Sequence, residues 1–268
     1  MRKALICLAA TAAFGQNARE ILTLPPPAYD ERIAYGTDAN QFGDLRLPQG
    51  KGPFPVVVII HGGYWLAQYN LAYAGHMGAA LTRRGFATWN IEYRRIGQPG
   101  GGYPGTLGDV AMAVDFLKKI AGKKRLDLRR VTALGHSAGG HLALWVAGRE
   151  KQVVRIGTVV SLAGVSDLRM VYERKMGNGV ALQLMGCSPE QCPEKYRAAS
   201  PAERLPLRAK VLLVHGDRDP TVPIEMAEDF VKKAGAGARL VKLEGAGHFE
   251  MVDTRRAEWR QVEELIVK

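Results

Sequence analysis

The stretch Val131-Thr132-Ala133-Leu134-Gly135-His136-Ser137-Ala138-Gly139-Gly140-His141-Leu142 decides the fold. Its apolar start, residues 131–135, is typical of a buried strand, and a helix is predicted to begin near Gly140. The Gly-x-Ser-x-Gly pattern between them places a serine at a sharp turn from strand to helix. Glycine is needed on both sides because the strained backbone leaves no room for a Cβ. Ser137 is therefore predicted to be a nucleophile at the carboxyl end of a sheet.

The same alternation of apolar runs and helical spacing continues through most of the chain. Buried strands are predicted at residues 56–60, 86–91, 131–135, 156–163, 210–215 and 239–243. Apolar residues between Leu107 and Ile120 recur every three or four positions, which predicts a helix. Strands separated by helices predict an α/β fold with a mostly parallel sheet covered on both faces. Residues 32–35 and 42–47 are predicted to be short antiparallel edge strands.

One interval departs from this alternation. Between residues 165 and 206 the apolar spacing is irregular, so we expect a short irregular insertion outside the sheet. An insertion of this kind is either a cover over an active site or a long surface connection. The spacing of the residues does not separate these two interpretations.

A serine hydroxyl becomes an effective nucleophile when a base takes its proton, and histidine is the usual base. Six histidines are present. His248 lies in Gly245-Ala246-Gly247-His248-Phe249, a glycine-rich loop after the last predicted strand. The chain order Ser, acid, His of this architecture places the base at this point. We therefore predict that His248 is the base, with a structural loop histidine as the alternative.

The carboxylate that orients this histidine is expected between the two, just past the end of a strand. Residues 215–223 offer Asp217 and Asp219. Asp219 is the better candidate because two neighbouring prolines stiffen its turn, whereas Asp217 is expected to cap the turn. Asp167, which follows another predicted strand, is a further alternative.

The tetrahedral oxyanion of such a reaction needs backbone hydrogen-bond donors. His61-Gly62-Gly63-Tyr64-Trp65 directly follows the strand predicted at 56–60, in the position of an HGGG-type loop. Its glycines allow N–H groups to turn towards a substrate oxygen. We predict that the N–H groups of Gly63, Tyr64 and Ala138 are the donors.

Two side chains beside these motifs are candidates for the substrate pocket. Trp65 follows the predicted oxyanion loop and either lines the pocket or packs in the core. His136 precedes the nucleophile and is predicted to line the pocket.

Together these motifs resemble those of an α/β-hydrolase of the esterase and lipase group, above all arylformamidase (kynurenine formamidase) and related small carboxylesterases. The resemblance extends from about residue 54 to the C-terminus. It is carried by His61-Gly62-Gly63-Tyr64-Trp65, Glu92-Tyr93-Arg94, the segment 135–142, Ala199-Ser200-Pro201, the segment 215–223 and Gly247-His248. It implies that Ser137, Asp219 and His248 are nucleophile, acid and base, and that no metal or organic cofactor takes part.

The N-terminus is predicted to be a separate segment. Met1-Arg2-Lys3 is positive and residues 4–14 are apolar, followed by small residues, which is typical of a secretory signal peptide at residues 1–15. A buried N-terminal helix is the alternative. The apolar run is shorter than the roughly 18 to 20 residues that span a bilayer, so no stable membrane anchor is expected. We expect a secreted or periplasmic protein with a single α/β-hydrolase domain at residues 16–268.

Removal of this segment would leave two of the three cysteines, Cys187 and Cys192. A close pair in an exported protein predicts a small disulfide loop. A metal site is the alternative, but it would need further Cys or His residues, and residues 168–209 contain none. No metal ligands are therefore predicted.

The formal charge of +11 raises the question of nucleic-acid binding. The basic residues are scattered in pairs, mostly near predicted helix ends, without a nucleic-acid-binding motif beside them. We therefore expect a basic surface and no nucleic-acid partner. Nothing in the sequence predicts the oligomeric state.

These predictions combine into one leading hypothesis, a serine esterase that acts on small carboxylic esters through an acyl-enzyme intermediate. The alternatives are an arylformamidase-type hydrolase of amides and a peptidase of the prolyl-oligopeptidase type. A binding protein without catalytic activity on a hydrolase scaffold is the alternative from another class.

Overall fold

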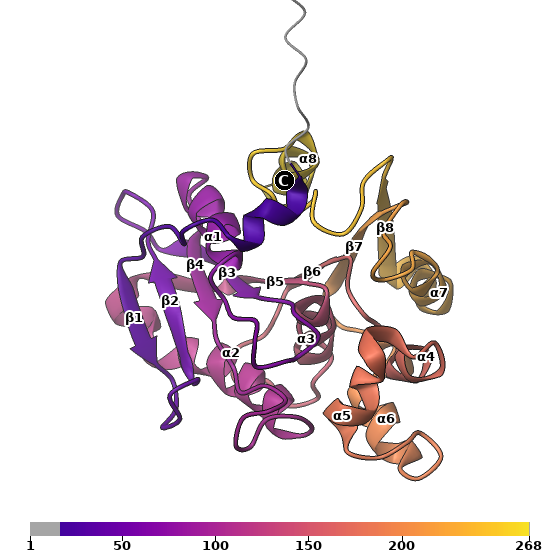
Figure 1. Ribbon diagram of the computed structural model, residues 1–268. Helices are drawn as coiled ribbons and strands as arrows, with labels where there is room; N and C mark the ends of the chain where they lie inside the picture. Colours follow the sequence, from indigo (N-terminus) through magenta and orange to yellow (C-terminus); the bar gives the residue numbers. More distant parts are fainter. Residues whose placement is uncertain (1–16, 268) are drawn as a thin grey trace, which may run out of the picture.

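A twisted sheet runs through the middle of the molecule (Figure 1). The computed structural model describes residues 17–267. Within this range the strands form one sheet in the order β1-β2-β4-β3-β5-β6-β7-β8. The strands are β1 (Glu31–Ala34), β2 (Phe42–Arg46), β3 (Phe54–Ile60), β4 (Ala87–Ile91), β5 (Leu126–His136), β6 (Thr158–Leu162), β7 (Lys210–Gly216) and β8 (Ala238–Leu243).

The pairing of the strands confirms the predicted fold class. β1 pairs with β2 and β2 pairs with β4 in antiparallel fashion, and the remaining pairs are parallel. The two short edge strands are therefore antiparallel, as predicted. The carboxyl ends of β3, β5, β6, β7 and β8 meet at one edge, where ligands bind in open α/β sheets.

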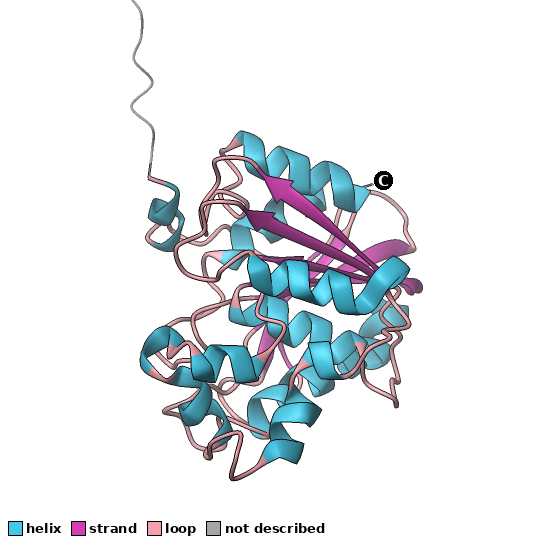
Figure 2. Cartoon of the chain, turned by 90° about the vertical axis from the view of Figure 1, so that its right-hand side faces the viewer, coloured by secondary structure: helices cyan, strands magenta, loops and turns pink. Residues whose placement is uncertain are grey.

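Helices cover both faces of this sheet, with strands between them in the edge-on view of Figure 2. Helices α1 and α8 pack on one face, and α2, α3 and α7 pack on the other. The long helices are α1 (Ala74–Arg83), α2 (Gly105–Lys124), α3 (Ala138–Ala147), α7 (Glu225–Ala234) and α8 (Ala257–Val267). A short 3-10 helix, η1 (Ala18–Leu22), packs with α1 and α8.

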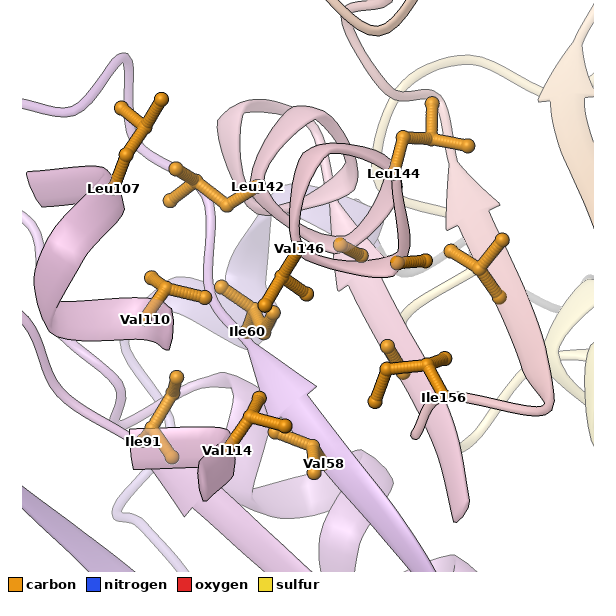
Figure 3. Close-up of a cluster of buried hydrophobic side chains, with 14 of the residues drawn as sticks. Val58, Ile60, Ile91, Leu107, Val110, Val114, Leu142, Leu144, Val146 and Ile156 are labelled. Atoms are coloured by element: carbon orange, nitrogen blue, oxygen red, sulfur yellow. The ribbon is translucent and has the colours of Figure 1, made fainter. Parts of the chain in front are cut away.

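The central strand β3 shows how the two cores form. Val56, Val58 and Ile60 belong to the core under α2 and α3, while Val57 and Ile59 belong to the core under α1 and α8. This period of two is the alternation of side chains along a strand. Figure 3 shows the first of these cores, where side chains of α2 and α3 meet those of β3.

Strand β5 begins five residues before its predicted start. The charged residues at its beginning conceal the apolar pattern: Asp127 pairs with Arg129 at 3.1 Å and with Arg130 at 2.9 Å. The strand register also shifts at this point, between Pro55 and Val56 of the neighbouring β3. Strand pairing therefore continues beyond the apolar segment that revealed the strand.

The interval 165–206 lies outside the sheet, but it is helical where irregular structure was expected. It contains α4 (Leu168–Glu173), η2 (Met176–Asn178), α5 (Val180–Met185), α6 (Pro193–Ala199) and η3 (Pro201–Glu203). These helices have at most seven residues each, too few to show a helical period in the sequence. Cys187 and Cys192 are joined by a disulfide between α5 and α6.

The predicted signal peptide, residues 1–15, lies outside the described residues. None of the helices between residues 17 and 267 combines the length and the apolar character that a membrane span requires.

Candidate active site

Ser137 occupies the turn between β5 and α3. Its backbone has φ 57° and ψ −121°, a region that residues other than glycine rarely adopt and that costs roughly 1–3 kcal/mol. The turn is held by a hydrogen bond from the Ser137 N–H to the Leu162 carbonyl, 2.8 Å long. Its side chain lines a cavity of about 200 Å³ at the carboxyl ends of the strands. This position and strain are typical of an enzymatic nucleophile.

The two glycines that flank this turn leave space for it. A Cβ on Gly135 would lie 2.0 Å from the Gly139 carbonyl oxygen, and a Cβ on Gly139 would lie 2.0 Å from the Ile60 carbonyl oxygen. Both distances are far below contact distance, and both partners are backbone atoms that cannot turn away. The strand, the turn and the start of α3 can therefore approach one another only with glycine at these positions.

His248 and Asp219 meet in the same region. His248 follows β8 and Asp219 follows β7, and the His248 Nδ1 donates to Asp219 Oδ2 at 2.6 Å. The other carboxylate oxygen of Asp219 accepts from the N–H groups of Thr221 at 2.7 Å and Val222 at 3.0 Å. Because Nδ1 is bound to Asp219, the Nε2 of His248 is the ring nitrogen available to a substrate. His248 and Ser137 line the same cavity.

The environment of Asp219 favours its ionised form. Burial by itself raises the pKa of this carboxyl group, but hydrogen bonds from His215 and His248 outweigh it and hold the pKa well below its ordinary value. An ionised Asp219 can fix the tautomer of His248 and stabilise its cation.

The two other aspartates considered from the sequence lie elsewhere. Asp217 accepts from the N–H of Gly245 at 2.7 Å and so joins the loops after β7 and β8. Asp167 caps the N-terminus of α4, where it accepts from the N–H groups of Arg169 and Met170. Of the three candidates, the structure brings Asp219 to His248.

The predicted oxyanion donors lie around the nucleophile. Gly63 and Tyr64 line the cavity, and Ala138 is the first residue of α3. Between residues 17 and 267, no protein group accepts a hydrogen bond from the N–H of Gly63, Tyr64 or Ala138. A Cβ on Gly62 would lie 2.9 Å from the Ser137 Cβ, so this loop packs directly against the nucleophile turn. Such unpaired amides can stabilise negative charge on a substrate oxygen.

A buried ion pair holds this loop in place. The His61 ring donates to Glu92 Oε1 at 2.9 Å and to the Gly62 carbonyl at 2.8 Å, and it stacks on Tyr93. The Tyr93 hydroxyl in turn donates to the His61 carbonyl at 2.8 Å. Burial raises the pKa of Glu92, but interactions with His61 and Arg95 and a hydrogen bond from the Tyr93 N–H together outweigh it and keep the pKa below its ordinary value. Glu92 and Tyr93 therefore hold the oxyanion loop in place through their hydrogen bonds with His61.

His136 lines the cavity, and both of its ring nitrogens are engaged. Nε2 donates to the His248 carbonyl at 2.9 Å, and Nδ1 accepts from the Tyr73 hydroxyl at 2.8 Å. The Tyr73 oxygen accepts from the Gly62 N–H at 2.7 Å. Burial, with the neighbouring His248, lowers the pKa of His136 to about 3, so the ring stays neutral. His136 thus connects the oxyanion loop with the loop of the base.

Trp65 does not line this cavity. Its side chain is 1% exposed, belongs to the core on the α2 and α3 face, and packs edge-on against His141 at 5.2 Å between ring centroids. The alternative given for this residue, core packing, is the one that the structure contains. Tyr64 and Trp65 both have a positive φ, 53° and 58°, and of the two it is Tyr64 that lines the cavity.

The interval 165–206 contributes no lining residue to the cavity among the described residues. It contacts the site where Gly177 packs against the ring of Tyr64 and where the Val165 N–H donates to the Ser137 carbonyl at 3.4 Å. The segment η1 lies at the cavity instead and contributes Arg19 and Leu22 to its wall. Sequence reasoning missed these two residues, and it also missed the lining residues Tyr69, Tyr73, Thr221 and Phe249. Thr221 and Phe249 lie within motifs already described, whereas no motif marks Arg19, Leu22, Tyr69 or Tyr73, which reach the cavity through the packing of separate segments.

Residues 44–234 match the BD-FAE protein family, which is well over half of the chain. The chain belongs to the BD-FAE family. The fold of this BD-FAE protein is also that of solved esterases. A carbohydrate esterase from gut microbiota, in truncated form, superposes with a TM-score of 0.75 at 24% identity, over 91% of this chain and 98% of that one. The α/β-hydrolase fold is thereby confirmed.

Two curated relatives are similar in sequence. A probable isoprenylcysteine alpha-carbonyl methylesterase of Oryza sativa subsp. japonica is 27% identical over 82% of this chain and 58% of its own length. The esterase LipC of Mycobacterium tuberculosis is 28% identical over 84% of this chain and 61% of its own length. This BD-FAE protein therefore spans about three fifths of the relatives it matches. Their names support an esterase, and the likeness to arylformamidase stays a prediction.

Proposed function

We propose that this protein is a serine hydrolase that cleaves small carboxylic esters through an acyl-enzyme intermediate. One observation carries the proposal: Ser137, in a strained turn, lines the same cavity as His248, whose Nδ1 is bound to Asp219 at 2.6 Å. This is the combination of nucleophile, base and orienting acid that ester hydrolysis requires. Membership of the BD-FAE family and the esterase names of the relatives agree with it.

In the first half of the reaction, the Ser137 Oγ attacks the ester carbonyl carbon while His248 Nε2 takes the hydroxyl proton. The carbonyl oxygen becomes an oxyanion, which the N–H groups of Gly63, Tyr64 and Ala138 stabilise. The C–O bond to the alcohol then breaks, and His248 returns its proton to the leaving alcohol. The acyl group remains on Ser137.

The second half repeats these steps with water. His248 Nε2 takes a proton from a water molecule, whose oxygen attacks the acyl carbon and forms a second oxyanion in the same position. The bond to Ser137 then breaks, the serine oxygen regains the proton from His248, and the carboxylic acid leaves. Asp219 keeps its charge throughout and stabilises the imidazolium form of His248.

The size of the cavity supports a short acyl group. Its volume of about 200 Å³ is smaller than the roughly 300–1,000 Å³ of pockets that enclose drug-sized ligands. Acetyl and formyl groups are both short enough for such a cavity. Because a formyl group is included, an arylformamidase-type activity is the second candidate.

We also propose that the protein is exported. The pattern of residues 1–15 supports this, as does the disulfide between Cys187 and Cys192, because disulfides persist mainly in oxidising compartments.

Hydrolysis of 4-nitrophenyl acetate by wild type and Ser137→Ala tests the proposal. We expect wild type to turn over this ester and the variant to lose about 10⁴- to 10⁶-fold in kcat. Ser188→Ala, in the disulfide loop and outside the walls of the cavity, is the matched control and should keep full activity. Unchanged hydrolysis by Ser137→Ala would exclude the proposed nucleophile, and a wild type without turnover would favour a binding protein.

A second measurement separates the two enzymatic candidates. The kcat/KM of wild type on aryl acetates is compared with that on N-formylkynurenine. We expect the ester to be the better substrate, and a clear preference for the formamide would replace the esterase proposal with the formamidase one.

A further inference from the structure

A second cavity adjoins the cavity at Ser137. The second cavity has a volume of about 370 Å³ and shares four wall residues with the first: Arg19, Thr221, His248 and Phe249. Groups of a substrate that extend from Ser137 past His248 would therefore reach the second cavity.

Two arginines line the second cavity. Arg19 belongs to η1, and Arg218 belongs to the loop that follows β7. Both are exposed, and neither side chain forms an ion pair or a hydrogen bond with any residue between 17 and 267. Some other arginines have acidic partners: Arg149 binds Asp115 at 2.9 Å and Arg94 binds Asp109 at 2.7 Å. Within residues 17–267, neither Arg19 nor Arg218 has an acidic partner in an ion pair.

The acidic residues nearby are engaged elsewhere. Glu250 is the only carboxylate among the described residues of the second wall, and its Oε2 accepts from the N–H groups of Gly247 at 3.0 Å and Phe249 at 3.2 Å. Glu20, beside Arg19, faces Arg255 at 3.7 Å. Asp217, beside Arg218, accepts from the Gly245 N–H. The described wall thus carries two arginines against one carboxylate, Glu250, so the second cavity keeps an excess of positive charge.

Arg19 is held at the cavity by its neighbours. Ile21 is fully buried in the core with α1 and α8, and Ala18 is 4% exposed. The Asn17 side chain accepts from the Arg19 N–H at 3.0 Å and fixes the start of η1. Figure 1 shows this segment, in indigo, beside α1 and α8. The guanidinium group is therefore free while the backbone that carries it is anchored.

We propose that Arg19 and Arg218 bind a carboxylate of the substrate, so that the preferred esters of this enzyme carry an anionic group beyond the scissile bond. The guanidinium group matches a carboxylate in shape and charge and can form two parallel hydrogen bonds with it. The inference rests on the proposed esterase function and deepens it, because it names the chemical class of the substrate.

A pair of aryl acetates that differ in one charge tests this proposal. 4-Acetoxybenzoate carries a carboxylate in the leaving group, and 4-acetoxybenzamide has a neutral group of the same shape. Their kcat/KM ratio is measured for wild type and for Arg19→Gln and Arg218→Gln. Comparison of the ratio between enzymes cancels the difference in intrinsic reactivity of the two esters.

We expect each variant to lose about 3- to 10-fold in kcat/KM on the benzoate. Arg218 lies outside the walls of the Ser137 cavity, so Arg218→Gln should stay within about 2-fold of wild type on the benzamide. Lysine at either position should restore part of the preference because it restores the charge. The preference of wild type should also fall as salt is raised from about 0.05 to 0.5 M, since exposed charges are screened. Arg155→Gln is the matched control: this arginine is exposed and lies before β6, at the opposite edge of the sheet.

The outcomes separate this inference from the proposed function. If the benzamide is hydrolysed and the arginine variants change both substrates equally, the carboxylate site is wrong and the esterase function stands. If neither ester is hydrolysed, the esterase function is wrong, and binding of both compounds to Ser137→Ala by calorimetry decides the inference without turnover. Equal affinity for the two compounds would then exclude a carboxylate site, and tighter binding of the benzoate, lost in Arg218→Gln, would support it.

Discussion

The two parts of the candidate active site differ in how their polar groups are held. At the carboxyl ends of the strands, Asp219, His248 and His136 are buried and each has hydrogen-bond partners in the protein. In the second cavity, the side chains of Arg19 and Arg218 are exposed and have no such partners among residues 17–267. Groups that must keep one geometry during a reaction are fixed by neighbours, whereas groups that bind a substrate charge are left to pair with the substrate.

Substitutions in the two parts should therefore have different effects on kinetics and stability. A change in the buried part should lower the rate on every substrate or lower the stability, because it removes a fixed partner. A change in the exposed part should alter the choice between substrates and little else. The predictions below follow that division, from the largest expected effect to the smallest.

The largest effect in the buried part is expected for Asp219→Asn. The amide cannot carry the charge that stabilises the His248 cation, and it permits the wrong tautomer of the ring. We expect kcat on aryl acetates to fall by about 10⁴-fold, equally for neutral and anionic esters. Steady-state kinetics on 4-acetoxybenzoate and 4-acetoxybenzamide measure this.

Asp217→Asn is the matched control for this change, since it lies two residues away in the same turn. Its carboxylate accepts from the Gly245 N–H, a bond that the asparagine oxygen can keep. We expect activity within a few-fold of wild type. A loss equal to that of Asp219→Asn would mean that the turn, rather than the Asp219 charge, determines the rate.

The next effect concerns the backbone of the nucleophile turn. Gly139→Ala places a Cβ 2.0 Å from the Ile60 carbonyl oxygen, so β3 and α3 must move apart. We expect the free energy of unfolding to fall by about 3 kcal/mol or more, as for overpacked cores, measured by urea denaturation.

Gly122→Ala in α2 is the control for that substitution, because a Cβ there meets nothing within 4 Å. Alanine is the better helix former, so this variant should gain about 0.5–1 kcal/mol. If both variants unfold at the same urea concentration, the close approach at Gly139 is not what requires glycine.

The smallest effect is a dependence of stability on pH. Burial lowers the pKa of His136 to about 3, so the folded ring stays neutral while the unfolded ring takes up a proton below its ordinary pKa of about 6.5. Stability is therefore lost as pH falls from about 6.5 towards 3, with a slope of up to about 1.4 kcal/mol per pH unit. His141, whose pKa burial lowers to about 4, adds to this slope.

His136→Gln should make this decline shallower, because glutamine takes up no proton. Urea denaturation at pH 7, 6 and 5 measures it, and Arg218→Gln is the control whose curve should run parallel to that of wild type. Parallel curves for wild type and His136→Gln would mean that His136 accepts a proton in the folded protein.

The sequence alone determined the sheet and the order of the polar groups along it. Buried parallel strands have continuous apolar sequences, and the turn at Ser137 requires glycine at positions 135 and 139. The strands and the turn can therefore each be recognised from a local sequence pattern. The prolines near Asp219 favoured it over Asp217 as the acid of the site. In the structure Asp219 binds His248, whereas Asp217 binds the Gly245 N–H. The start of β5 and the short helices of the interval 165–206 were missed because charged residues or short length conceal their periodicity.

Only the tertiary structure decided what surrounds these groups. Trp65 directly follows Gly63 and Tyr64 in sequence, yet its side chain packs in the core. Arg19 lies more than a hundred residues before Ser137, yet packing of Ile21 against α1 and α8 brings it to the same cavity. Local spacing encodes the direction of a strand or a turn, whereas the wall of a cavity depends on contacts between distant segments, which no local pattern records.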